Sequence, residues 1–165
     1  MINFHTVKWK NFLSTGNKFS TIDIDETKTT LMIGTNGAGK STMMDAISFG
    51  LFGKPFRKIR IGQLVNSINC KNMSVELTFT TGGKEYLIKR GLKPAKFEIY
   101  VDGALQNQDA AARDQQEFLE KYILKMNEKS FYGGLTFSPL PISFEYNSYI
   151  RSFINLFFFG SFSLL

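Results

Sequence analysis

The sequence predicts an α/β fold in which a mixed sheet continues into an antiparallel β meander. Three observations predict it. An apolar run at residues 29–33 leads into a glycine-rich loop and then into an apolar helical stretch at residues 41–52. Apolar and polar residues alternate through residues 74–101, as they do in strands with one buried face. Apolar residues then recur at helical spacing across residues 113–126, which predicts a second helix.

Two strands are predicted before the apolar run. Residues 2–12 alternate loosely between apolar and polar side chains, and residues 19–24 form a second short stretch of strand character. A polar turn at residues 25–28 leads into the strand at residues 29–33. We expect the first two strands to be antiparallel and to feed that third strand, which then lies at the centre of the mixed sheet.

The loop at residues 34–41 has the sequence Gly-Thr-Asn-Gly-Ala-Gly-Lys-Ser, which fits the phosphate-binding P-loop pattern in its strand–loop–helix context. Its glycines permit backbone conformations in which successive N–H groups point at phosphate oxygens. Lys40 adds a positive charge for the terminal phosphates, and the Ser41 hydroxyl is placed to bind magnesium. The amino end of the following helix contributes roughly half a positive charge. A lysine–serine pair at a helix start has no packing purpose, which argues against a glycine-rich turn that binds nothing.

The helix at residues 41–52 carries so little polar surface that we expect it to be buried on more than one side, and Gly50 and Gly53 mark its end. Pro55 blocks its continuation. Residues 54–60 then hold four basic side chains in seven positions. Two interpretations stay open for them, a solvated surface turn or a contact with phosphate or DNA.

The meander follows at residues 74–101, with hairpin turns at residues 81–84 and 102–103. We expect it to lie beside the nucleotide-binding strand. Two interpretations stay open for its basic side chains, solvated charges at a sheet edge or a nucleic-acid surface. These side chains are Lys84, Lys89, Arg90, Lys93 and Lys96.

The helix at residues 113–126 is predicted to be amphipathic and to lie at the surface. Its polar side holds Glu117, Glu120 and Lys121. Its apolar side, expected to face the core, holds Phe118, Leu119, Tyr122, Ile123 and Met126.

Composition and charge limit the partners, the cross-links and the metal sites that can be expected. The 165 residues carry a formal charge of +6 and a sequence pI near 9.4, which favours an acidic partner such as nucleic acid. One cysteine, Cys70, and one histidine, His5, exclude an internal disulfide and argue against a zinc site. We expect both to be packing residues. The amino terminus shows no basic region followed by an apolar run, so a cytoplasmic setting is expected.

The composition changes after Phe131. Only Glu145 and Arg151 are charged beyond it, and eight phenylalanines fall between residues 131 and 165. Residues 149–165 are apolar enough to raise the alternative of a membrane anchor, but polar residues interrupt them and they fall short of the roughly 20 residues that a spanning helix needs. We therefore predict two parts, residues 1–131 and an atypical phenylalanine-rich tail at residues 132–165.

Three further runs carry a family resemblance. They are Phe-Gly-Leu-Phe-Gly-Lys-Pro-Phe-Arg at residues 49–57, Gly-Gln-Leu-Val-Asn-Ser at residues 62–67 and Ile-Lys-Arg-Gly-Leu-Lys-Pro at residues 88–94. With a P-loop near the amino terminus, the first 131 residues resemble the amino-terminal lobe of the SMC-like DNA-repair ATPases of the Rad-fifty type. Within that family they are most similar to the large subunits of recombination endonucleases from T-even-like phages.

The resemblance implies an ABC/SMC-type ATPase head that works with a nuclease subunit on double-stranded DNA ends, in the host cytoplasm if the gene is a phage gene. It implies ATP and magnesium as cofactors, and a second copy of the head that closes over two ATP molecules. By motif matching it assigns magnesium to Ser41. It assigns nucleotide binding to Asn36, Gly37, Ala38, Gly39, Lys40, Ser41 and Thr42.

This sequence also departs from the family pattern. The family has a glutamine a few residues after the Ser-Phe that matches Ser130 and Phe131, and Tyr-Gly-Gly-Leu stands here instead. The signature motif, the coiled coil, the zinc-hook cysteines and the second-lobe acidic pair are not found in this chain. We therefore expect family sequence to stop near Phe131, because of a shifted frame, an intervening sequence or truncation, and the chain alone to be inactive, with no catalytic residue of its own. The alternatives are a fragment of an ABC-type transporter ATPase and a non-enzymatic fragment held at a membrane by its tail.

Overall fold

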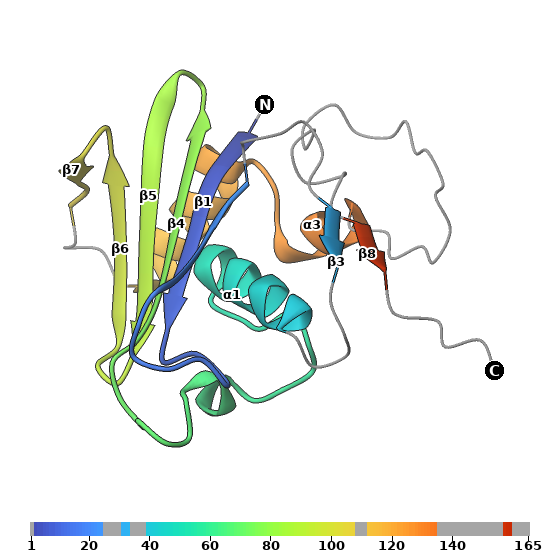
Figure 1. The fold of residues 1–165 in the computed structure, drawn as a ribbon. Helices are drawn as coiled ribbons and strands as arrows, with labels where there is room; N and C mark the ends of the chain where they lie inside the picture. Colours follow the sequence, from blue (N-terminus) through green and yellow to red (C-terminus); the bar gives the residue numbers. More distant parts are fainter. Residues whose placement is uncertain (1, 25–30, 34–38, 108–111, 135–156, 160–165) are drawn as a thin grey trace.

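The computed structural model describes residues 2–24, 31–33, 39–107, 112–134 and 157–159 (Figure 1). Six strands form one antiparallel sheet with helix α1 against one face. The strands are β1 (Ile2–Lys10), β2 (Ser20–Asp23), β3 (Leu31–Ile33), β4 (Met73–Thr81), β5 (Lys84–Leu92), β6 (Lys96–Val101), β7 (Ala104–Leu105) and β8 (Phe157–Phe159). The helices are α1 (Lys40–Phe52), the 3-10 helix η1 (Ile61–Leu64), α2 (Ala112–Phe118), the π-helix η2 (Leu119–Leu124) and α3 (Glu128–Gly134).

The predicted strands and the α/β class are confirmed, but the meander lies beside a different strand from the one expected. The main sheet has the order β2-β1-β4-β5-β6-β7, and every pairing in it is antiparallel. Strand β3 instead pairs in parallel with β8, with Leu31 opposite Phe157. The expected place of this strand at the centre of one mixed sheet is therefore wrong. The nine-residue β4 forms a ladder along the whole of β1, and β2 takes the other edge of β1, so neither edge is open to β3.

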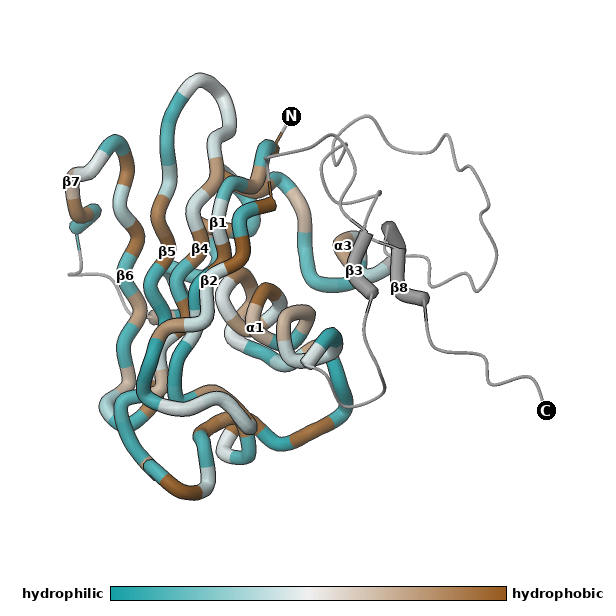
Figure 2. Tube along the Cα trace, in the orientation of Figure 1, coloured by the Kyte–Doolittle hydropathy of each residue, from teal (hydrophilic) through white to brown (hydrophobic). Residues whose placement is uncertain are grey.

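The core lies between the inner face of the sheet and α1. Alternate residues of β1, β4, β5 and β6 face inward, and the alternation of hydropathy along these strands is visible in Figure 2. All residues from Thr42 to Phe52 are buried, which confirms that α1 is covered on more than one side. The helix ends as predicted, at Gly53, whose φ of 70° lets its N–H reach the Phe49 carbonyl.

Gly50 sets the distance between α1 and the sheet. A methyl group at this position would lie 2.3 Å from Leu77 Cδ1 and 3.3 Å from Val75 Cγ1. Leu77 and Val75 are themselves fully buried, so neither has room to move away. Only glycine therefore permits the helix to approach β4 this closely.

The outer face of the sheet carries a row of alternating charge across four strands. Lys8 lies opposite Glu76, Glu76 opposite Lys89, and Lys89 opposite Glu98. Glu98 also forms an ion pair with Lys96 at 3.0 Å, and this contact together with the Tyr100 hydroxyl lowers its pKa against the opposing effect of burial. Lys89 and Lys96 are therefore neutralised locally, as expected of solvated charges on a sheet.

Arg90 fits neither interpretation of the basic meander, because it points to the inner face. Its position in β5 lies opposite Val75 and Phe97, both on that face. The guanidinium donates from Nε to the Gly50 carbonyl at 3.1 Å and from an Nη to Gln116 Oε1 at 2.6 Å, and it stacks 3.6 Å from the centre of the Phe97 ring. Burial lowers the pKa of Arg90 to about 9, so it stays charged at neutral pH and complements the carboxyl end of α1.

The helix predicted at residues 113–126 is present, but the prediction of which of its side chains are buried is partly wrong. Leu119 and Ile123 are buried as expected, whereas Phe118 is 43% and Tyr122 69% exposed, and Leu124 is buried in their place. The cause is the π-helix η2. Its wider turn brings positions four and five residues apart onto one face, which rotates the apolar side away from the α-helical register.

Cys70 also departs from expectation. It is exposed, with its thiol 3.0 Å from the Ser67 carbonyl, so it is not a packing residue. His5 is half-buried, with Nε2 3.2 Å from the Thr80 hydroxyl oxygen.

The predicted boundary after Phe131 falls inside α3. Phe131 is buried 5.3 Å from the Phe52 ring, and Tyr132, on the other side of that boundary, lies 5.1 Å from the Phe56 ring. Residues 135–156 and 160–165 lie outside the described residues, so the separate character of the tail stays a prediction. Within the described ranges, no helix is both long and apolar enough to cross a membrane.

Replacing Gly50 by Ala tests the close approach of α1. Alanine should favour an isolated helix by roughly 1 kcal/mol, but the clash with Leu77 should reverse the sign and lower the free energy of unfolding by about 1 to 3 kcal/mol. Urea denaturation measures the difference. Gly62→Ala, where a methyl group meets no atom within 4 Å, is the control and should leave stability within about 0.5 kcal/mol. A stabilised Gly50→Ala variant would show that the contact is loose.

Candidate functional site

The amino end of α1 carries the described part of the P-loop. Gly39 caps the helix with a φ of 95°, a conformation that favours glycine, and Lys40, Ser41 and Thr42 form the first turn. Lys40 is half-buried, Ser41 exposed and Thr42 buried. The other predicted nucleotide-binding residues, Asn36, Gly37 and Ala38, lie outside the described residues.

A cavity of about 540 Å³ opens beside this turn, within the size range of small-molecule sites. Three segments far apart in the sequence form its wall: the loop after β1, the first turn of α1, and the segment between α1 and β4. The lining residues are Leu13, Ser14, Gly39, Lys40, Ser41, Thr42, Arg57, Gln63, Val65 and Ser67.

Sequence reasoning identified one side of this cavity and missed the other. Gln63, Val65 and Ser67 fall in the run at residues 62–67 that carried the family resemblance, so a signal for them existed. Leu13 and Ser14 had none, because a short polar loop after a strand shows no pattern that distinguishes it from any other turn.

Arg57 reaches the cavity wall while it is held by a carboxylate of α1. Asp45 is completely buried, and its Oδ2 accepts from Arg57 Nε and lies 2.6 Å from Arg57 Nη2. Its Oδ1 accepts the backbone N–H of Arg57 at 2.9 Å. The Arg57 side chain stays 45% exposed. Oδ2 is thus engaged by the guanidinium and Oδ1 by the backbone, and together these charge-assisted contacts fix both the loop and the direction of the guanidinium.

The basic run at residues 54–60 therefore divides between the two interpretations. Arg57 and Lys54 are engaged within the protein, Lys54 with Glu128 at 3.0 Å, which raises its pKa. Lys58 and Arg60 are exposed.

An asparagine cluster holds together the two loops that line the far wall. Asn11 is buried at the end of β1. Its Oδ1 accepts from Asn69 Nδ2 at 2.7 Å, and its Nδ2 donates to Asn17 Oδ1 at 3.0 Å and to the Asn72 carbonyl at 3.2 Å. Asn66 adds a second connection, since its Nδ2 donates to the Leu13 carbonyl at 2.9 Å. Side-chain amides can satisfy several backbone groups at once, which suits them to join irregular segments.

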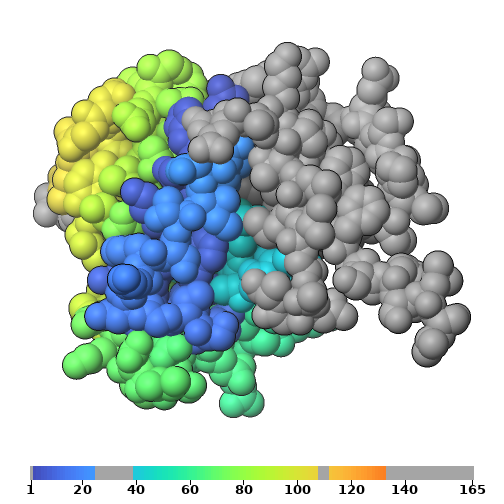
Figure 3. Space-filling model, in the orientation of Figure 1, coloured from blue at the N-terminus to red at the C-terminus, as the bar shows by residue number. Residues whose placement is uncertain are grey.

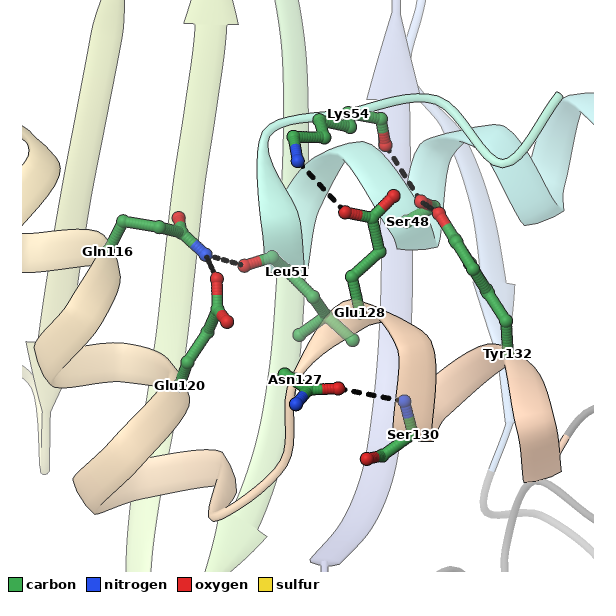
Figure 4. A network of polar contacts seen from close by, with 9 residues as sticks. All are labelled: Ser48, Leu51, Lys54, Gln116, Glu120, Asn127, Glu128, Ser130 and Tyr132. Carbon is green, nitrogen blue, oxygen red and sulfur yellow. Dashed lines mark hydrogen bonds and ion pairs between the residues drawn. The ribbon is translucent and has the colours of Figure 1, made fainter. Parts of the chain in front are cut away.

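The opposite end of α1 is fixed by a second polar network, shown in Figure 4. Ser48 Oγ donates to the Lys54 carbonyl at 2.7 Å, so its contact with Tyr132 requires the phenol to donate. Burial raises the pKa of Tyr132, which keeps that proton in place. Gln116 Nε2 donates to the Leu51 carbonyl at 3.0 Å and to Glu120 Oε1 at 2.7 Å.

Together these contacts hold α1 between Asp45 and Leu51, with its first turn at the wall of the cavity. A lysine, a hydroxyl and the positive end of a helix dipole at one wall fit an anion with phosphate chemistry. Among the described residues, no group of three His, Cys, Asp or Glu side chains could hold a metal by itself.

Comparison with known proteins places the chain in a family. A family model described as "AAA domain" matches residues 6–159. Exonuclease subunit 2 of Enterobacteria phage T4 is 49% identical over 125 residues, which are 74% of this chain and 22% of that protein. The DNA double-strand break repair Rad50 ATPase of Thermoplasma acidophilum is 34% identical over 131 residues, or 76% of this chain and 14% of the relative. The chain thus spans about a fifth or less of the length of these relatives.

Among solved structures, the Smc head domain of Pyrococcus furiosus, bound to the C-terminal domain of ScpA, has a TM-score of 0.55 at 22% identity. The match covers 85% of this chain and 39% of that one. The predicted fold class, the amino-terminal lobe of an ABC/SMC-type ATPase head, is confirmed. So is the resemblance to Rad-fifty-type ATPases and to the phage subunit.

Replacing Asp45 by Ala should destabilise the protein, because it removes a fully buried carboxylate and leaves the Arg57 backbone N–H and guanidinium without their acceptor. We expect a loss of about 2 to 3 kcal/mol in the free energy of unfolding, measured by urea denaturation. The control is Lys54→Ala, which removes an exposed ion pair and should cost no more than about 0.5 kcal/mol. Equal losses in the two variants would contradict a structural role for the buried carboxylate.

Proposed function

The chain belongs to the AAA domain family, and on that premise we propose that it is the ATP-binding lobe of an ATPase of DNA recombination and repair. The observation that carries the proposal is the position of Lys40 and Ser41. Both stand in the first turn of α1 and line the cavity of about 540 Å³.

The phosphates of ATP would lie against the first turn of α1. Lys40 would neutralise the terminal phosphates, and the backbone N–H groups from Asn36 to Thr42 would donate to phosphate oxygens. Ser41 would hold magnesium, which screens the negative charge of the phosphates when bound. Gly39 fits a place beside the phosphates because its backbone is left-handed and it has no side chain. A Cβ at this position would meet no atom within 4 Å, so the space beside the backbone is open.

The base and the sugar would occupy the opposite wall. Leu13 and Val65 offer apolar surface there, while Ser14, Gln63 and Ser67 offer hydrogen-bonding groups. A mixed lining of this kind suits a nucleoside, which has a flat apolar face and polar edges.

The larger assembly is proposed from the relatives. One is named as an exonuclease subunit and another as a DNA double-strand break repair ATPase. We propose that this lobe works with a separate nuclease subunit on double-stranded DNA ends, and that two copies of the head close over two ATP molecules. The cytoplasm, that of the host for a phage protein, is the proposed location.

The chain alone is proposed to bind ATP without hydrolysing it. In the family, the groups that sense the terminal phosphate and activate water stand on the glutamine loop, the signature motif and the second lobe. None of these motifs was recognised in the present sequence. Binding and hydrolysis can therefore be tested separately.

Replacing Lys40 by Ala should abolish nucleotide binding while the fold is retained. In wild-type protein, magnesium-ATP at about 100 times its Kd should stabilise the fold by roughly 2.7 kcal/mol, seen as a rise in Tm. Lys40→Ala should lose this rise, and Ser41→Ala should lose its dependence on magnesium. Lys84→Ala, an exposed position at the far end of the β4–β5 hairpin, is the matched control and should behave as wild type. A full ATP-dependent rise in Lys40→Ala would refute the site.

Phosphate release measures the second part of the proposal. Incubated with magnesium-ATP, the chain should release phosphate no faster than the Lys40→Ala variant, even under conditions in which thermal shift shows that ATP is bound. Turnover above that background by wild-type protein would contradict the proposed inactivity and leave the binding proposal standing.

A further inference from the structure

Three loops meet at one end of the main sheet, the lower end in Figure 1. They are residues 11–19 between β1 and β2, residues 53–72 between α1 and β4, and the turn at residues 93–95 between β5 and β6. The asparagine cluster joins the first two, through the bond from Asn69 to Asn11. The backbone N–H of Asn72 donates to the Lys93 carbonyl at 2.7 Å and joins the third. In Figure 3 the blue and green segments accordingly form one unbroken surface at this end.

This end of the molecule carries charge of one sign. The charged residues within 8–22, 54–75 and 89–97 are all lysine or arginine. Some are engaged elsewhere: Arg57 with Asp45, Lys54 with Glu128, Lys89 with Glu76, Lys96 with Glu98, and Arg90 in the core.

Seven cations are left after these are removed, and two of them, Lys8 and Lys10 in β1, are half-buried. The other five are exposed, and in the part of the chain that the structure describes none of these five forms an ion pair. They are Lys18, Lys58, Arg60, Lys71 and Lys93. Like charges on adjoining loops repel one another, and this repulsion is relieved when a polyanion lies across them.

The positions of these cations relate them to the cavity. Leu13 and Ser14 belong to the same loop as Lys18, while Gln63 and Ser67 belong to the same segment as Lys58 and Lys71. The two loops therefore line the cavity and also carry the exposed charge.

We infer that Lys18, Lys58, Arg60, Lys71 and Lys93 form a contact surface for the sugar–phosphate backbone of double-stranded DNA. The choice of DNA rests on the proposed function, whereas the location of the surface rests on the charges and the loops. Ammonium and guanidinium groups that contact phosphates carry no sequence information, so binding at this surface is independent of sequence. Each cation in contact releases a counterion and adds to the salt dependence of binding.

The double variant Lys58→Ala with Arg60→Ala tests the surface. Fluorescence anisotropy with a labelled blunt duplex of mixed sequence, between 50 and 200 mM KCl, gives the affinity and its salt dependence for the full chain. The variant should bind about tenfold more weakly, and the slope of log K against log salt should fall by about 1.8, or 0.9 for each cation lost. The matched control is Lys84→Ala with Lys129→Ala, two exposed lysines outside the three loops, which should retain the wild-type slope.

The rise in Tm with magnesium-ATP is measured on the same preparations and separates the two proposals. A weakened duplex affinity with an unchanged ATP-dependent rise supports the surface. An unchanged affinity and slope in the loop variant, or an equal loss in the control, overturns it, and would be the outcome if an acidic protein were the partner. If the Tm of the wild-type chain does not rise with magnesium-ATP, the proposed function is overturned. The salt dependence of duplex binding then tests the contact surface by itself.

Discussion

Helix α1 has eleven consecutive buried residues, from Thr42 to Phe52, and this burial fixes the position of everything around it. Its approach to the sheet depends on Gly50, since a methyl group there would overlap Leu77. Its carboxyl end is held by Arg90 and Gln116, which donate to the carbonyls of Gly50 and Leu51. A helix held in this way cannot slide or tilt without exposing apolar surface or breaking buried hydrogen bonds. Its amino end therefore presents Lys40 and Ser41 to the cavity in a fixed position.

The parts of the fold that follow from local periodicity could be predicted from the sequence. Alternation along β4, β5 and β6 located the meander, and the P-loop pattern located α1 and the nucleotide-binding end of the cavity. Features that depend on tertiary partners could not be predicted. The parallel pairing of β3 with β8 joins residues more than a hundred positions apart, and the π-turn in η2 exposes Tyr122 although the residue spacing looks α-helical.

Arg90 shows most clearly why charge in a sequence does not locate a surface. It stands among lysines in the sequence, yet the strand register turns it inward, where the Phe97 ring and the Gln116 side chain receive it. The alternation of Tyr86 and Ile88 along the strand places position 90 on the same inner face. The free-energy cost of burying a guanidinium argued against an inward-facing Arg90. Two hydrogen bonds and the carboxyl end of α1 offset this cost.

The two edges of the main sheet have a consequence for how it can meet other chains. Strand β2 has four residues, and β7 has two. The adjoining part of β6 that β7 leaves uncovered carries the charged side chains of Lys96 and Glu98. A foreign strand added at such an edge would gain few backbone hydrogen bonds and would bury these charges, which discourages aggregation by strand addition. Recognition by this lobe is therefore left to side chains on its loops and helix ends, where single substitutions can alter one contact without disturbing the sheet.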